Sequence, residues 1–171
     1  VKEASVNLTR GVSVVVPVYN SEPTLRPLAE RLEAALSTAG FPFEVILVND
    51  ASSDGSWAVI EELAARYPWL AGLDLMRNYG QHNALLAGIR RARYDRTVTL
   101  DDDLQHPPEE ILRLLAKLDE GLDVVYGALN RLQGLEERKI VSLSDQITTQ
   151  FDFELLMHTP AMALGTCRYK L

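Results

Sequence analysis

Up to residue 127 the chain alternates between short apolar runs and longer segments in which apolar residues recur every three or four positions. The short runs are rich in Val, Ile and Leu, which is typical of strands buried on both faces. The periodic segments are typical of amphipathic helices. We therefore predict strands over 12–16, 43–48, 70–76, 97–100 and 123–126, and helices over 24–39, 56–67, 81–91 and 109–118.

This alternation predicts an α/β fold, a doubly wound and mainly parallel sheet with helices on both faces. In such sheets ligands bind beyond the carboxyl ends of the strands. Beyond residue 130 the alternation stops, and helical patterns over 134–145 and 147–157 are what remains. We therefore divide the chain into a domain over 1–130 and an atypical, helical C-terminal segment over 131–171.

Charge and cysteine content narrow the class of protein. The 171 residues carry a formal net charge of −7, and the acidic excess lies entirely within 1–130. The arginines between 90 and 96 lack the interleaved aromatic residues typical of nucleic-acid binding, so we exclude a nucleic-acid partner. The single cysteine, Cys167, excludes an internal disulfide and fits a reducing compartment. The sequence shows no secretory leader and no apolar run of about 18 residues.

Polar residues cluster after each of the first four strands, and no Gly-rich phosphate-binding motif occurs. The strongest signal is the run Asp101, Asp102 and Asp103, because adjacent carboxylates repel one another unless a cation compensates them. Strand alternation predicts that Asp101 and Asp103 point the same way and share one Mg²⁺ or Mn²⁺ with a diphosphate. The alternative is a solvated acidic loop that caps the helix beginning near residue 107.

The other strand-end residues allow two interpretations each. Asp50 either accepts hydrogen bonds from a base or sugar, or forms an Asx turn before the next helix. Ser53 or Asp54 is expected to be the N-cap of that helix. Arg77 either meets a diphosphate or forms a surface ion pair, and the histidines at 82 and 106 are either substrate donors or structural residues.

Four segments in this order resemble a known family. They are Val14-Val15-Val16-Pro17-Val18-Tyr19-Asn20, Val48-Asn49-Asp50-Ala51-Ser52-Ser53-Asp54-Gly55-Ser56, Arg77-Asn78-Tyr79-Gly80-Gln81-His82 and Leu100-Asp101-Asp102-Asp103-Leu104-Gln105-His106-Pro107-Pro108-Glu109. The chain resembles family-2 inverting glycosyltransferases of GT-A fold. Within that family it is most similar to the polyprenyl-phosphate branch, which includes dolichol-phosphate mannose synthase and undecaprenyl-phosphate sugar transferases.

The resemblance implies the site residues and their ligands. It implies a UDP- or GDP-sugar donor bound by Pro17, Tyr19, Ser21, Val48, Asp50 and Asp102. It implies Mg²⁺ or Mn²⁺ held by Asp101, Asp103 and Gln105, the two aspartates being the catalytic carboxylates. Two positions depart from the family pattern, since Ser21 stands where Glu is frequent and Ala51 where Gly is common.

The implied activity is inverting sugar transfer to a polyprenyl phosphate in cell-envelope or glycan biosynthesis, at the cytoplasmic face of the membrane. A lipid phosphate is already anionic and needs no general base. We find no family motif in 131–171, so a truncated or altered form, active only as a nucleotide-binding module, is the alternative. A metal-dependent phosphotransferase is a third reading, but it explains neither the first nor the third loop.

Overall fold

The computed structural model describes residues 9–129, 138–142 and 167–170. In chain order its elements are β1 (Thr9–Val18), α1 (Glu22–Leu36), β2 (Phe43–Asn49), α2 (Ser56–Arg66), β3 (Leu70–Asp74), α3 (Gln81–Arg91), β4 (Tyr94–Thr99), the 3₁₀ turn η1 (Pro108–Glu110), α4 (Ile111–Leu118), β5 (Val124–Leu129), β6 (Arg138–Ser142) and β7 (Cys167–Lys170). Each helix and strand predicted up to residue 126 is present, with ends that coincide with the predicted ones at α3 and differ by a few residues elsewhere.

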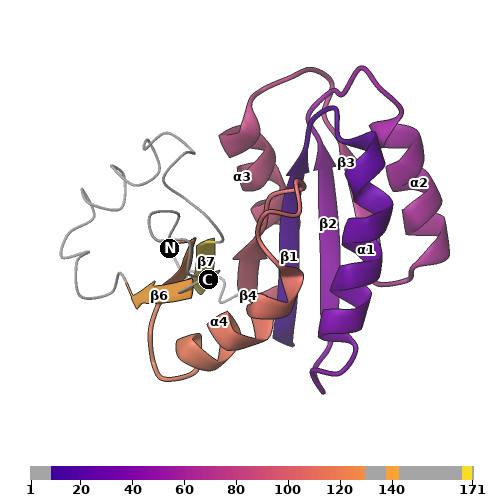
Figure 1. Ribbon diagram of the computed structural model, residues 1–171. Helices are drawn as coiled ribbons and strands as arrows, with labels where there is room; N and C mark the ends of the chain where they lie inside the picture. The colour runs from indigo at the N-terminus through magenta and orange to yellow at the C-terminus, as the bar shows by residue number, and fades with distance from the viewer. Residues whose placement is uncertain (1–8, 130–137, 143–166, 171) are drawn as a thin grey trace, which may run out of the picture.

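The strands form one sheet in the order β3-β2-β1-β4-β7-β5-β6 (Figure 1). β1 pairs in parallel with both β2 and β4, and β2 pairs in parallel with β3. β7 lies antiparallel between β4 and β5, and β6 is antiparallel to β5. The predicted α/β class with a mainly parallel sheet is therefore confirmed.

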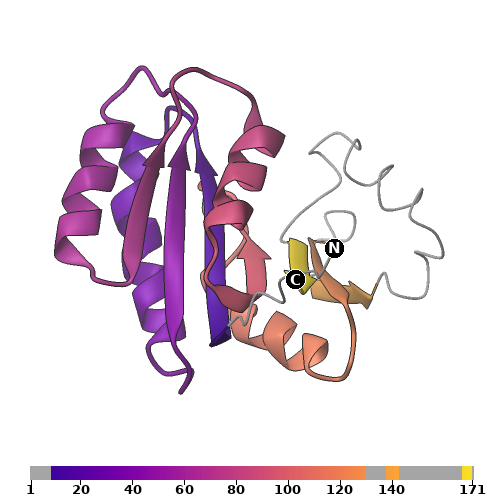
Figure 2. The same cartoon turned by 180° about the vertical axis from the view of Figure 1, so that it is seen from behind.

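β1 is the central strand of the parallel part and is buried on both faces. Val14 and Val16 belong to the hydrophobic cluster formed with α1, α2 and α4. Val15 belongs to the cluster on the other face, under α3. Figures 1 and 2 show these helices on opposite sides of the sheet. An apolar side chain at every position from 14 to 16 is what this two-sided burial requires.

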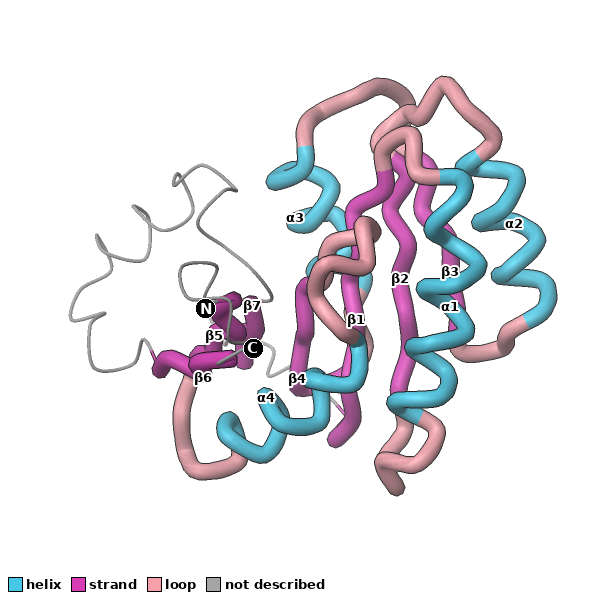
Figure 3. The backbone as a smooth tube through the Cα atoms, viewed as in Figure 1, coloured by secondary structure: helices cyan, strands magenta, loops and turns pink. Residues whose placement is uncertain are grey.

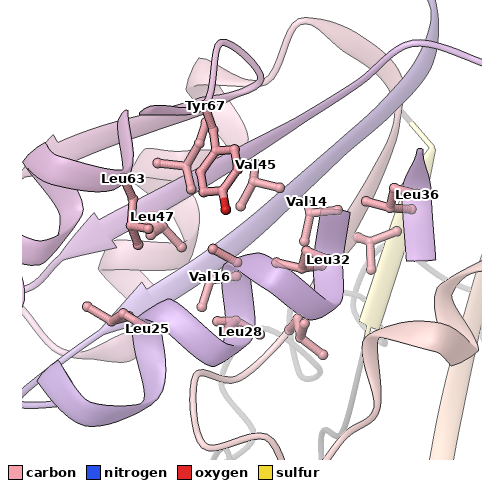
Figure 4. Packing of buried hydrophobic residues seen from close by; sticks show 14 of the residues in the cluster. Val14, Val16, Leu25, Leu28, Leu32, Leu36, Val45, Leu47, Leu63 and Tyr67 are labelled. Carbon is pink, nitrogen blue, oxygen red and sulfur yellow. The ribbon is translucent and has the colours of Figure 1, made fainter. Parts of the chain in front are cut away.

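α1 presents its apolar stripe to the sheet. Its buried residues recur at helical spacing and pack against β1, β2 and α2 (Figure 4); they include Leu25, Leu28, Leu32 and Leu36. The helix begins at Glu22, two residues earlier than predicted, so Pro27 lies in its second turn. Pro27 is exposed, so water can satisfy the carbonyl oxygen that lacks its N–H partner.

α3 covers the other face and approaches the sheet closely. A Cβ added at Gly88 would lie 2.3 Å from Val15 Cγ1 and 3.0 Å from Val48 Cγ2. A side chain at position 88 would therefore push α3 away from β1 and β2. This contact places the first turn of α3, which begins at Gln81, above the carboxyl end of the sheet (Figure 3).

The helix predicted over 134–145 is wrong for the part that the structure describes, because residues 138–142 form β6. Ile140 and Val141 favour extended backbone, and β5 offers β6 a partner strand. Sheet pairing therefore outweighs the helical pattern of the surrounding charges. Likewise Cys167 belongs to β7, and the helix predicted over 147–157 lies outside the described residues.

A buried polar network joins the strands at the amino edge of the sheet. Glu44 is 4% exposed, and its Oε1 accepts hydrogen bonds from Ser13 Oγ and the Arg93 backbone N–H, both at 2.7 Å. Its Oε2 accepts one from Arg93 Nε at 2.7 Å. Because each partner comes from a different element, this carboxylate ties β1 and the α3–β4 turn to β2.

We expect Glu44→Gln to lower the free energy of unfolding by about 1–2 kcal/mol, since an amide replaces a charged acceptor of three hydrogen bonds with a weaker one. Urea denaturation at pH 7 measures this loss. Glu61→Gln, on the exposed surface of α2, is the control and should change the free energy by less than about 0.5 kcal/mol. Equal stability of the two variants would contradict the role given to Glu44.

Candidate functional site

The loops that follow β1, β2, β3 and β4 enclose a cavity of about 480 Å³ at the carboxyl edge of the sheet. This volume is typical of small-molecule sites. Its lining residues are Pro17, Val18, Tyr19, Asp50, Asn78, Gly80, Gln81, Asp101, Asp102 and Asp103. The four polar clusters recognised in the sequence therefore meet at one place.

The first two loops are held together by hydrogen bonds between backbone and side chains. Asn20 Oδ1 accepts a bond from the Ser53 N–H at 2.8 Å, and Ser52 Oγ accepts one from the Asn20 N–H at 3.0 Å. The Ser21 N–H donates to Ser56 Oγ at 2.9 Å. These contacts span more than 30 residues of sequence, and they give one wall of the cavity a defined shape.

Asp50 fastens the second loop to the third. It is 3% exposed, and its two oxygens accept the backbone N–H groups of Tyr79 at 2.7 Å and Gly80 at 2.8 Å. The local contact at the start of this loop is made by its neighbour Asn49, whose Oδ1 accepts from the Ser52 N–H three residues further on. Asp50 therefore shapes the cavity through the backbone of residues 79 and 80.

The acidic run lies in a turn after β4, which ends at Thr99. We predicted from strand alternation that Asp101 and Asp103 point the same way and Asp102 points away from them. That reason is wrong, because residues 101–103 lie beyond the end of the strand. All three carboxylates line the cavity, because Leu104 adopts a left-handed φ of 60° and the chain turns there. In the described residues η1 begins without a side-chain cap hydrogen bond, and the alternative of a solvated loop whose charge favours the helix N-terminus stays a prediction.

Burial raises the pKa of both Asp101 and Asp102 above the ordinary aspartate value, and the charge of Asp103 raises both further. Four contacts oppose the rise. At Asp101 they are the charge of His106 and a hydrogen bond from Gln81, and at Asp102 they are hydrogen bonds with Ser21 and the Tyr19 backbone. In the described part of the chain, no Lys or Arg forms an ion pair with these carboxylates. The cavity therefore carries concentrated negative charge.

This donor set fits a hard divalent cation that is shared with a phosphate ligand. The described residues contain no group of three or more His, Cys, Asp or Glu side chains arranged to hold a metal by themselves. Two carboxylates from the Asp101–Asp103 turn, completed by water and diphosphate oxygens, match the way proteins usually bind Mg²⁺. The residues present thus suit a cation that arrives with its substrate.

The predicted site residues fall into two groups. Those that line the cavity are Pro17, Tyr19, Asp50, Asp101, Asp102 and Asp103. Ser21 lies behind this lining, bonded to Asp102. The Val48 side chain is fully buried beneath α3, beside Pro17 in the strand register. Gln105 is exposed, and its backbone N–H donates to Asp103 Oδ1 at 3.0 Å.

Other candidates are placed outside the cavity lining. Gly55, rather than Ser53 or Asp54, is the N-cap of α2, and Asp54 instead accepts the Ser56 and Glu22 N–H groups. The Arg77 guanidinium lies over the Tyr79 ring, 4.8 Å from its centroid. Trp57 and Trp69 pack against the main hydrophobic cluster.

Asn78, Gly80 and Gln81 are cavity residues to which the sequence motifs assigned no role. Their position directly after a predicted strand is the sequence feature that could have identified them as cavity residues. Gly80 is the N-cap of α3 with a φ of 86°, a conformation that favours glycine. The chain can therefore turn sharply there and bring Gln81 over the acidic turn.

Non-glycine residues with left-handed backbone occur at Asn20, Ala51 and Leu104, one in each of the loops after β1, β2 and β4. This conformation costs an L-residue about 1–2 kcal/mol. Strain of this kind concentrates around functional sites. It is least expected at Ala51, which has a φ of 55° and no side-chain polar group to offset the cost.

We expect Ala51→Gly to raise the free energy of unfolding by up to about 1 kcal/mol, because relief of the strained φ exceeds the entropy that glycine adds to the unfolded chain. Ala58→Gly, at an exposed position within α2, is the matched control and should lower it by roughly 0.5–1 kcal/mol. Urea denaturation compares the two variants. Destabilisation by both would contradict this account of Ala51.

Comparison with known proteins identifies a family. The sequence profile described as "Glycosyl transferase family 2" matches residues 13–162. The match extends past residue 130, into the segment in which we found no family motif.

Two curated relatives share one name, undecaprenyl-phosphate 4-deoxy-4-formamido-L-arabinose transferase. The protein of Klebsiella pneumoniae subsp. pneumoniae is 50% identical over 132 residues, which cover 77% of this chain and 40% of the relative. That of Klebsiella pneumoniae strain 342 is 48% identical over 155 residues, covering 90% of this chain and 45% of the relative. The chain thus spans less than half the length of these relatives.

Solved structures support the fold. A mannosyltransferase from Pyrobaculum calidifontis, in complex with GDP-Man and Mn²⁺, is 25% identical with a TM-score of 0.57; the match covers 75% of this chain and 39% of that one. Mannosyl-3-phosphoglycerate synthase from Rubrobacter xylanophilus has a TM-score of 0.67 at 19% identity, covering 94% of this chain and 54% of that one. The second likeness concerns the fold alone.

Proposed function

The chain belongs to glycosyl transferase family 2, and from this premise we propose that it forms the donor-binding part of an enzyme that transfers a sugar from a nucleotide to undecaprenyl phosphate. The observation that carries the proposal is the acidic cavity at the carboxyl edge of a parallel sheet. The name of the relatives at 48–50% identity supports the choice of a polyprenyl-phosphate acceptor.

Each side of the cavity has a role in this proposal. Pro17, Tyr19 and Asp102, at the ends of β1 and β4, contact the base and ribose of the nucleotide. Asp50 supports the same region by holding the backbone of residues 79 and 80. Asp101 and Asp103, assisted by Gln105, hold Mg²⁺ or Mn²⁺ against the diphosphate. The presence of Mn²⁺ in the structure of the mannosyltransferase relative supports this assignment.

When bound, the cation would neutralise the negative charge that builds on the departing nucleoside diphosphate. The residues of the chain orient the donor so that its anomeric carbon is open to in-line attack with inversion. A lipid phosphate attacks as an anion, and therefore no protein group has to remove a proton from it.

The proposed acceptor implies that the enzyme acts at a membrane surface, on the cytoplasmic face where nucleotide sugars are made. Among the helices of the described residues, none combines the length and apolar character needed to cross a bilayer. The proposal places membrane contact at the acceptor, whose isoprenoid chain lies in the lipid phase.

Calorimetric titration of UDP and GDP, with and without Mn²⁺, tests the donor assignment. We expect one nucleotide to bind, and to bind more tightly with Mn²⁺; failure of both nucleotides to bind would overturn the proposal. The acceptor assignment is tested by incubating the chain with the matching radiolabelled nucleotide sugar and either undecaprenyl phosphate in detergent or an alkyl glycoside. Label transfer to the lipid phosphate is expected. Transfer to the hydroxyl acceptor alone would refute the acceptor class, and binding without transfer would indicate a nucleotide-binding module.

A further inference from the structure

Gln81 connects the third loop to the acidic turn. It is the first residue of α3, and its Nε2 donates a hydrogen bond to Asp101 Oδ1 at 2.8 Å. The second oxygen of Asp101, Oδ2, lies 4.0 Å from His106 Nδ1, a buried nitrogen without a hydrogen-bond partner in the described residues. Within the described residues, the one short side-chain hydrogen bond to the Asp101 carboxylate is therefore the bond from Gln81.

The position of Gln81 is itself constrained. The two backbone N–H groups directly before it, those of Tyr79 and Gly80, are both bound by the buried carboxylate of Asp50. Gly80 turns the chain with a φ of 86° and starts α3. The packing of Gly88 against Val15 then fixes how closely the helix approaches the sheet. The start of α3, and with it Gln81, is thus held by Asp50, which directly follows β2, and by Val15 of β1.

A carboxylate binds a cation well only if one oxygen keeps a defined direction. Asp101 lies in a turn, where strand pairing does not hold its backbone, and its side chain is one-third exposed. A donor on Oδ1 selects one rotamer and leaves Oδ2 available on the other side. Neighbours that orient ligands in this way typically contribute 10- to 100-fold to metal affinity.

We propose that Gln81 is a positioning residue for Asp101, and that through this bond it sets the affinity of the cavity for the divalent cation that accompanies the nucleotide. This inference rests on the function proposed above. Gln81 does not contact the cation itself. Loss of the Gln81 side chain therefore lowers nucleotide affinity measured with the cation and leaves nucleotide affinity measured without the cation unchanged.

The experiment compares the wild type with Gln81→Ala and Asn83→Ala. Asn83 is the matched control, because its Nδ2 also makes a hydrogen bond in the first turn of α3, to the Tyr79 carbonyl at 2.7 Å, without contacting Asp101. Mn²⁺ affinity is measured by electron paramagnetic resonance of the free ion at saturating nucleotide. Nucleotide affinity is measured by calorimetry with and without Mn²⁺, and thermal unfolding reports on the fold.

We expect Gln81→Ala to weaken Mn²⁺ binding 10- to 100-fold and to leave nucleotide affinity without Mn²⁺ unchanged, while Asn83→Ala retains the wild-type Mn²⁺ affinity. Equal Mn²⁺ affinity in the wild type and Gln81→Ala would overturn the inference and leave the proposed function standing. Equal losses with and without Mn²⁺ would also overturn it, since they indicate a general disturbance of the loop. If the wild type itself shows no Mn²⁺-dependent binding, the proposed function fails first.

Discussion

Asp101→Asn is expected to remove the Mn²⁺-dependent enhancement of nucleotide binding, weakening affinity in the presence of Mn²⁺ at least 100-fold. The amide keeps an oxygen that can accept the hydrogen bond from Gln81 Nε2, so the local geometry of the turn is preserved. The variant lacks the negative charge that a hard cation requires. Calorimetric titration of the nucleotide with and without Mn²⁺ measures the effect.

The same substitution is expected to stabilise the protein in the absence of Mn²⁺. Burial raises the pKa of Asp101, so the folded protein holds this proton more tightly than the unfolded chain. Ionisation of Asp101 therefore disfavours folding as the pH rises above about 4, the value in an unfolded chain. The full penalty is present in the wild type once the pH exceeds the folded-state pKa of Asp101, whereas asparagine does not ionise.

Thermal unfolding between pH 4 and pH 8 checks the direction of this stability change. The melting temperature of Asp101→Asn, relative to that of the wild type, should rise with increasing pH and then level off above the folded-state pKa. Loss of both stability and nucleotide binding would show that Asp101 serves the fold and would count against its role as a cation ligand. Opposite changes in stability and binding are typical of a functional carboxylate.

The second large effect concerns Asp50. Asp50→Ala leaves the N–H groups of Tyr79 and Gly80 without their acceptor at a position that is 3% exposed. A fully buried unsatisfied donor costs about 1–3 kcal/mol, and these two are part-buried, so we expect the free energy of unfolding to fall by roughly 2–4 kcal/mol in total. The loop that carries Gln81 would also lose its attachment to β2, and nucleotide affinity should fall with it.

Urea denaturation and nucleotide calorimetry on the same samples measure both effects. Asp74→Asn is a suitable control, because Asp74 lies one strand away and accepts a single side-chain bond, from Asn49 Nδ2 at 2.7 Å. It should cost about 1 kcal/mol or less and should leave nucleotide binding intact. If Asp50→Ala retained wild-type stability and lost only nucleotide affinity, Asp50 would be a direct ligand contact instead of a clamp on the third loop.

The residues that form the sheet and its helices could be predicted closely. Val14, Val15 and Val16 are apolar because both faces of β1 are covered there, and α3 was predicted with its observed ends, Gln81 and Arg91. Predictions were weaker where pairing with another strand decides the structure. Residues 138–142 form a strand because β5 lies beside them. The local sequence pattern does not indicate this pairing.

For the candidate site, the sequence by itself determined which loops carry polar groups and that they gather at one edge of a parallel sheet. This is because apolar periodicity is a local property and the topology of such sheets is restricted. Only the tertiary structure decided what each polar group does there. Asp50 binds the backbone near residue 80, Asp102 binds the first loop, and Gln81 binds Asp101. Each of these bonds joins residues at least 20 positions apart, and its geometry depends on how several helices pack on the sheet.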